Sequence, residues 1–209
     1  MKLIAFLLLF TFNLQSFAED NVKVLSVKGL VSYDGEYIKK GQTLSTGKVL
    51  DASGKSYVVI EYPGGRKLQL KSARAKINSM GSKESEIELL AGKLFGWFKP
   101  SIKKKKATRP FRIQTRGVVA GVRGTKFMIE ELSKKTYLCV CEGEVAINKG
   151  DQQVALKKGF DLWDKVGQSS LKEPAYAQTA MLDRVAESVS EMGGTTQKYW
   201  MEEGWKGQK

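Results

Sequence analysis

The residues best placed to do chemistry lie in Val122-Arg123-Gly124-Thr125-Lys126-Phe127, where an arginine and a glycine interrupt an apolar run. An arginine in apolar surroundings must be ion-paired or hydrogen-bonded, and the nearby acids are Glu130, Glu142 and Glu144. We favour a structural interpretation, in which Arg123 makes an internal pair or clamps the backbone. In the alternative, Arg123 faces an acidic ligand. The motif core is Arg123, Gly124, Thr125 and Phe127.

A run of four lysines is the second candidate site. Lys103, Lys104, Lys105 and Lys106 follow Trp97 and Phe98 and precede Arg109 and Arg112. Basic residues near an anionic surface contribute about 1 kcal/mol each, and the neighbouring aromatic rings can insert at such an interface. The alternative is a solvated loop, because charge runs are commonly solvated.

Several kinds of chemistry are excluded or disfavoured. The chain has no histidine, which removes His-dependent triads and most zinc sites. Cys139 and Cys141 share one face of a predicted strand with Cα atoms roughly 6.5 to 7 Å apart, at the limit of disulfide geometry, so we interpret them as core residues. The glycines between Gly117 and Lys126 resemble a P-loop, but a β-run follows them where a helix is required. We predict no catalytic residue, metal site or cofactor.

The chain begins with a stretch typical of a secretory signal peptide. A charged start, the apolar run from Leu3 to Phe12 and the small residues Ser16 and Ala18 predict cleavage after Ala18; a retained anchor is the alternative. We therefore expect an exported protein, in the periplasm or at the cell surface, with no transmembrane span after cleavage. Its formal charge of +13 favours lipid phosphates or acidic polymers over nucleic acid as partners, whereas a merely well-solvated surface is the other interpretation.

The body of the chain has a β pattern. Short apolar runs alternate with turns at Asp34-Gly35, Ala52 to Lys55 and Pro63 to Gly65, at intervals of about 8 to 12 residues. This spacing predicts an all-β fold, an antiparallel β-sandwich or a roll of stacked hairpins. Val118, Ala120 and Val122 share one parity and Phe127 and Ile129 the other, so one core for both sets requires a bulge at Gly124.

A strand-glycine-strand step recurs at Gly29, Gly92 and Gly143. The recurrence suggests hairpins of similar shape, although chance repetition of common turn residues explains it equally well. Gly92 and Gly96 also suit a strand that closely approaches another backbone.

One amphipathic helix is expected after the strands. The β signal ends past Trp163, Pro174 is suited to a first helical turn, and apolar residues from Met181 to Met192 recur at helical spacing up to Gly193-Gly194. The tail beyond it carries Tyr199, Trp200 and Trp205, which either dock on the parent domain or bind a partner. The expected organisation is a signal peptide (1–18), a β-domain (19–166) and a C-terminal helix and tail (167–209).

Three blocks carry a family resemblance. The blocks Arg109 to Thr115, Val122 to Phe127 and Glu142 to Val145, preceded by Gly92-Lys93-Leu94-Phe95, resemble the FecR domain in order and spacing over roughly Val22 to Val166. The resemblance implies an all-β periplasmic unit that binds protein partners without catalysis. FecR-type regulators also carry a cytoplasmic anti-sigma segment and a transmembrane helix. We expect neither here, so the resemblance does not imply control of a sigma factor.

The expected function is therefore a non-enzymatic exported binding, signalling or scaffold domain that contacts a protein or polymer of the cell envelope. A structural envelope protein, held to anionic membrane or wall polymer by its basic loop as a peripheral contact, is the alternative. An enzyme is the third and weakest hypothesis, because no paired acid/base spacing stands out.

Overall fold

The computed structural model describes residues 21–81, 84–99 and 110–201. The predicted signal peptide, Lys103 to Lys106, Arg109 and Trp205 lie outside these residues. The elements are β1 (Val22–Lys28), β2 (Ser32–Tyr33), β3 (Glu36–Tyr37), β4 (Thr43–Leu44), β5 (Val49–Tyr62), β6 (Arg66–Met80), β7 (Ser85–Trp97), β8 (Phe111–Gln114), β9 (Val119–Glu131), β10 (Lys135–Lys149), β11 (Gln152–Lys157), β12 (Phe160–Lys165), β13 (Ala175–Tyr176), α1 (Thr179–Glu191) and the 3-10 turn η1 (Tyr199–Met201).

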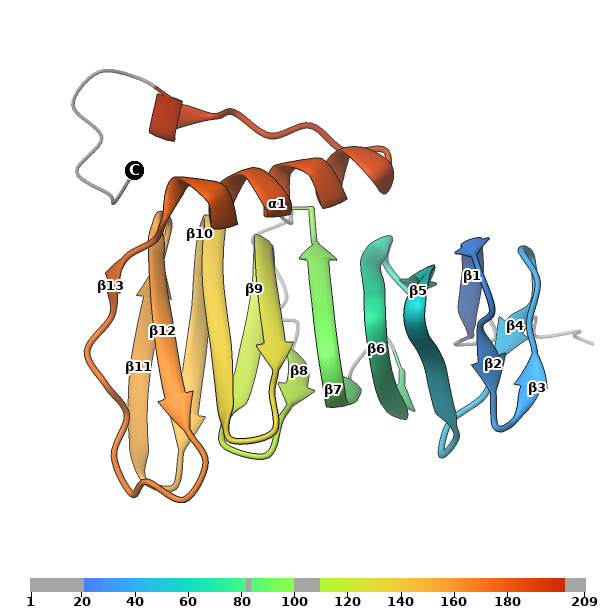
Figure 1. The fold of residues 1–209 in the computed structure, drawn as a ribbon, viewed down its shortest axis with the longest axis horizontal. Helices are drawn as coiled ribbons and strands as arrows, with labels where there is room; N and C mark the ends of the chain where they lie inside the picture. Colours follow the sequence, from blue (N-terminus) through green and yellow to red (C-terminus); the bar gives the residue numbers. More distant parts are fainter. Residues whose placement is uncertain (1–20, 82–83, 100–109, 202–209) are drawn as a thin grey trace, which may run out of the picture.

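The strands form one sheet in which neighbours in the chain are mostly neighbours in space (Figure 1). Its order is β13-β12-β10-β9-β8-β7-β6-β5-β1-β4, with β11 beside β10, and with β2 beside β5 and β3. The predicted all-β fold with one C-terminal helix is confirmed. The predicted antiparallel pairing holds for the described strand pairs except β7 and β8, which are parallel.

Each of the long strands β5, β6, β7, β9 and β10 bends midway. On β6, Leu68 and Leu70 are buried before the bend and Ala73 and Ala75 after it, so the buried parity switches while the side chains stay in one core. Of the glycines of the recurring step, Gly92 and Gly143 lie at such bends with φ of 85° and 83°, and Gly29, with φ of 78°, directly follows the end of β1. Glycine is favoured at these positions because it adopts positive φ without a Cβ clash.

The bends fold the sheet over its core. β6 is 15 residues long and would span about 46 Å if straight. Its first residue, Arg66, nevertheless donates from Nη2 to Oγ of Ser85 at 2.9 Å, and Ser85 lies beside Met80, the last residue of β6. The ring centroids of Tyr62 and Phe111 likewise lie 4.7 Å apart across the core.

Two layers therefore face each other around one apolar cluster. The layer that we call the helix layer contains β1, β12 and the strand segments 57–62, 66–71, 92–97, 126–131 and 135–140. The layer that we call the open layer contains β2, β8, β11 and the segments 49–52, 73–80, 85–91, 119–123 and 143–149.

Helix α1 covers the outer face of the helix layer (Figure 1). Leu182, Val185 and Val189 pack on Phe95 and Met128 in a second apolar cluster. The helix begins at Thr179, so the prediction that Pro174 lies in its first turn is wrong: Pro174 precedes β13, which pairs with β12. Among the described residues, no helix combines the length and the hydropathy that crossing a membrane requires.

Candidate functional site

The motif Val122 to Phe127 forms the bend of β9. Arg123 pairs with Glu144 and Lys126 with Glu142, so two residues of β9 lie opposite Gly143 alone. Gly124 has φ of 61°, and Val122 and Phe127 on either side of it are both buried in the core between the layers. The predicted bulge at Gly124 is confirmed, together with the single core that it serves.

Arg123 is exposed, which corrects the expectation of a partly buried, paired arginine. Its side chain lies on the outer face of the open layer because Val122, its neighbour, points inward. Glu144 lies opposite it in register and is exposed as well. Glu130 and Glu142 pair with Lys93 at 3.3 Å and Lys126 at 2.7 Å. No hydrogen bond or ion pair engages the guanidinium of Arg123 in the part of the chain that the structure describes.

Thr125 and Phe127 stabilise the bend of β9 through contacts with β7 and the residue that follows it. The Thr125 carbonyl accepts the amide N–H of Phe98 at 2.9 Å. The ring of Phe127 lies over Gly96 of β7, where an added Cβ would meet its Cε1 at 2.0 Å. Phe98 is 3% exposed and its ring contacts those of Phe111 and Phe127 at 5.1 and 5.6 Å. Phe98 is therefore a core residue, and the idea that it inserts at an interface is wrong.

Of the lysine run and its flanking residues, the structure describes Trp97, Phe98 and Arg112, and Arg112 is engaged by Glu84 and Glu86 at 2.8 Å each. The half-buried ring of Trp97 lies between two lysines, with Nζ of Lys67 and of Lys99 at 4.9 and 5.4 Å from the ring centroid. Gly194 packs on the same indole, where a Cβ would come within 2.8 Å of it. Lys67 also donates to the carbonyl of Met192 at 2.8 Å, so it serves the C-terminal end of α1 as well.

The described part of the tail docks on the chain itself. The Tyr199 hydroxyl donates to the carbonyl of Cys141 at 2.9 Å. Trp200 is 4% exposed and donates from Nε1 to the carboxylate of Asp183 at 3.2 Å. Of the two alternatives for the tail, docking accounts for these two residues.

The cysteines lie beneath α1, both fully buried and both reduced. Burial raises the pKa of the Cys139 thiol to about 12 and also raises the pKa of the Cys141 thiol. Their thiolate fraction at neutral pH is therefore very small, which suits core residues and not nucleophiles.

Three buried acids, Glu131, Asp161 and Asp164, were missed by the sequence analysis. Glu131 and Asp164 are 2% and 1% exposed and lie on either side of Thr136 in one row across β9, β10 and β12. Thr136 donates to Oε2 of Glu131 at 2.7 Å, and Lys149 of the open layer donates to Oδ1 of Asp164 at 2.5 Å. Burial raises the pKa of Glu131. The hydrogen bond from Thr136 lowers this pKa in part, as does the charge of Arg116, whose Nε lies 3.4 Å from Oε1 of Glu131. The inward parity of Glu131 and Asp164 beside Ile129 and Leu162 was the available signal.

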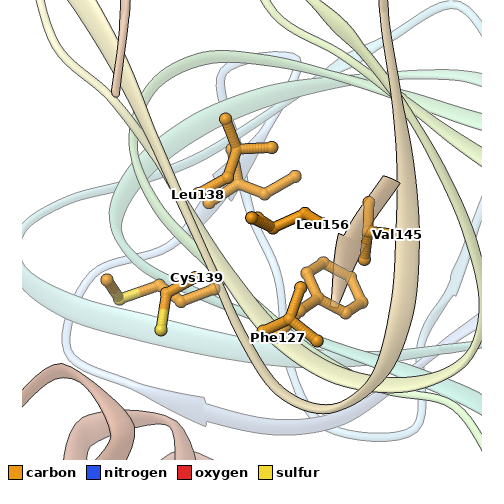
Figure 2. A pocket seen from close by; sticks show the side chains of 8 residues that line it. Phe127, Leu138, Cys139, Val145 and Leu156 are labelled. Carbon is orange, nitrogen blue, oxygen red and sulfur yellow. The ribbon is translucent and has the colours of Figure 1, made fainter. Parts of the chain in front are cut away.

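Asp164 ties the two layers together at one end of the core through Lys149, whereas Glu131 and Thr136 both belong to the helix layer. No group of three or more histidine, cysteine or acidic residues that could hold a metal is found within residues 21–81, 84–99 and 110–201. A small pocket lies among β9, β10 and β11 and is lined by Phe127, Leu138, Cys139, Val145 and Leu156 among others (Figure 2). It is apolar and has no room for a water molecule, so it is a gap in packing.

The comparisons with known proteins agree with this fold. A family model described as FecR protein matches residues 42–146. Two crystal structures of a proposed anti-sigma factor from Parabacteroides distasonis ATCC 8503, at 1.65 and 2.50 Å resolution, each superpose with a TM-score of 0.51 at 14% identity. The similarity covers 61% of this chain and 59% of that one, and at this identity it shows the fold. A search of curated proteins gives no match.

The matched residues run from just before β4 into β10 and so include the bends of all five long strands. They leave α1 and the tail outside the match. Since the matching family model covers half of the chain, the chain belongs to the FecR protein family.

Proposed function

We propose that the chain is a non-enzymatic signalling or scaffold domain that works by binding a protein or polymer of the cell envelope. The observation that carries this proposal is that the potentially reactive side chains among the described residues have structural roles. Glu131 is bonded to the adjacent strand β10, Asp164 is bonded to Lys149 across the core, and Cys139 and Cys141 are buried beneath α1. The motif around Gly124 shapes a strand. What the fold offers to other molecules is its surface.

Crosslinking followed by mass spectrometry in the envelope of cells that make the chain tests the proposal. We expect a stoichiometric crosslinked protein, or retention on an isolated polymer fraction, from the compartment outside the cytoplasm. Recovery of the chain from the cytoplasm with an intact N-terminus would contradict the envelope location. The absence of any crosslinked or retained partner would contradict the binding function.

A second candidate function is attachment to an anionic membrane or wall polymer. The arrangement of Trp97 between Lys67 and Lys99, just before the lysine run, favours it. Binding to vesicles of phosphatidylglycerol, but not of phosphatidylcholine, should weaken with salt. It should also weaken when Lys103 to Lys106 are changed to Gln. Unchanged binding in that variant would refute the role of the loop.

A further inference from the structure

An apolar patch lies at the N-terminal end of the sheet. Leu30 and Tyr37 are 71% and 70% exposed. Tyr37 lies opposite Ser32, and the Ile38 amide donates to the Val31 carbonyl at 3.0 Å, so Leu30 is the diagonal neighbour of Tyr37 on the outer face of the open layer. Two large apolar side chains that share one exposed face form a patch to which a partner can bind.

The same end presents an unpaired strand edge. β3 pairs with β2 and with no other strand that the structure describes. Because Ile38 bonds toward β2, the N–H and C=O of Tyr37 point away from it. In the helix layer, β1 pairs on its outer side with β4 at Val22 and Lys23. An edge with free main-chain groups is a template for a further strand.

At the other end of the sheet the open layer ends at β11, which pairs with β10 alone among the described strands but carries none of the large exposed apolar side chains. The helix layer ends there at β12, which carries the buried Asp164 in its inward row beside Leu162, and β13 covers part of the edge of β12. Inward-pointing charges on an edge strand are a known means of preventing strand addition. Tyr176, which is exposed there, stacks on Phe160 with ring centroids 4.6 Å apart. The N-terminal end combines an unpaired strand edge with large exposed apolar side chains, and it is therefore the better docking surface of the two.

The surroundings of the patch are basic. Residues 21–48 contain five lysines and two acids, and one of those acids, Asp34, lies 3.7 Å from Lys48. Lys39 and Lys40 follow β3 after the buried Ile38, and both are exposed. A partner that carries acidic residues would gain complementary charge here and a faster association rate.

We propose that this N-terminal docking patch, made of Leu30, Tyr37, Lys39 and Lys40, binds an extended acidic segment of a partner protein. The segment adds as a strand beside β3, covers Leu30 and Tyr37 with apolar side chains and places carboxylates near the two lysines. This inference rests on the proposed function, because it assigns a binding surface to a binding domain.

Site-specific photo-crosslinking in the full-length chain tests the proposal. Tyr37 is replaced by benzoylphenylalanine, and Tyr176 is replaced in a matched control at the opposite end. We expect a crosslink from position 37 to a stretch of another protein in which acidic and apolar residues are mixed, and no such crosslink from position 176. Changing Lys39 and Lys40 together to Glu should lower the yield at least fivefold. The same charge change at Lys157 and Lys172, which are exposed elsewhere, should leave it unaltered.

The outcomes separate the inference from the function on which it rests. Crosslinks from position 176 alone, or from position 37 to a second copy of this chain or to a basic segment, would overturn the docking patch while leaving a binding domain. If neither position nor general crosslinking yields a partner, both proposals fail. Insensitivity to the change at Lys39 and Lys40 would overturn the acidic character of the segment.

Discussion

The bends can be tested by adding one methyl group to a glycine. Gly92 and Gly54 both adopt positive φ, 85° and 69°. A Cβ on Gly54 would meet nothing within 4 Å, whereas a Cβ on Gly92 would lie 2.0 Å from the carbonyl oxygen of Ser72 and 2.6 Å from Cα of Ala73. Gly54→Ala therefore measures the cost of the backbone conformation, and Gly92→Ala measures that cost plus the loss of close approach between β6 and β7.

The expected magnitudes follow from these two terms. A left-handed conformation costs a non-glycine residue about 1 to 2 kcal/mol, and the reduced freedom of the unfolded chain offsets roughly 0.4 to 1 kcal/mol of it. We expect Gly54→Ala to lower the free energy of unfolding by about 1 kcal/mol. Gly92→Ala adds overpacking against backbone, typically about 1 to 3 kcal/mol. The expected difference between the two variants is therefore about 2 kcal/mol.

Urea denaturation followed by circular dichroism measures the difference. With a slope of about 2 kcal/mol per molar urea, 2 kcal/mol corresponds to a midpoint shift of about 1 M between the variants. If the midpoints of Gly92→Ala and Gly54→Ala agree within about 0.3 M, the close approach of β6 and β7 at Gly92 does not limit stability, and our account of the bend is refuted.

Three further predictions concern the core, the buried acids and the helix. Gly96→Ala should destabilise the fold by about 1 to 3 kcal/mol, and less so in a Phe127→Leu background, where the ring that the methyl group meets is gone; additive unfolding energies would contradict the contact. Because burial raises the pKa of Glu131 above its ordinary 4.5, the folded state disfavours the ionised form. The wild type should therefore gain stability relative to Glu131→Gln as the pH falls from 7 through the folded pKa, measured by urea midpoints at several pH values; a relative loss on acidification would show the opposite shift. Val185→Ser, at a fully buried position of α1, should speed the reaction of Cys139 and Cys141 with a thiol reagent under native conditions. The exposed control Val166→Ser should leave the rate unchanged, and equal rates in both variants would mean that α1 does not protect the thiols.

Alternation of side chains predicted the bulge at Gly124, because it requires only that apolar residues of both parities share a core. The same alternation requires Arg123 to point outward when Val122 points inward, and Arg123 is indeed exposed. Short apolar runs predict separate strands, because in the sequence a glycine at a bend within a strand looks the same as a glycine in a turn between strands. The turn expected at Ala52 to Lys55 is instead the bend within β5, which continues from Val49 to Tyr62.

The roles of Glu131 and Asp164 could not be predicted from local pattern. Their partners, Thr136 and Lys149, come from β10, and Lys149 reaches Asp164 across the core only because β10 is bent. A contact of this kind depends on the fold of the whole sheet. The placement of Trp97 against Gly194 depends on the path of the tail in the same way.

The insertion of β8 gives the two layers unequal widths. In the helix layer, β7 pairs directly with β9, whereas in the open layer β8 stands between them. Adjacent strands are about 4.8 Å apart, so the open layer is broader than the helix layer by about that distance at this step. A strand of four residues thus changes the order of the strands from one layer to the other. Deleting β8 would leave the open-layer segments of β7 and β9 without a partner on the sides that now face it.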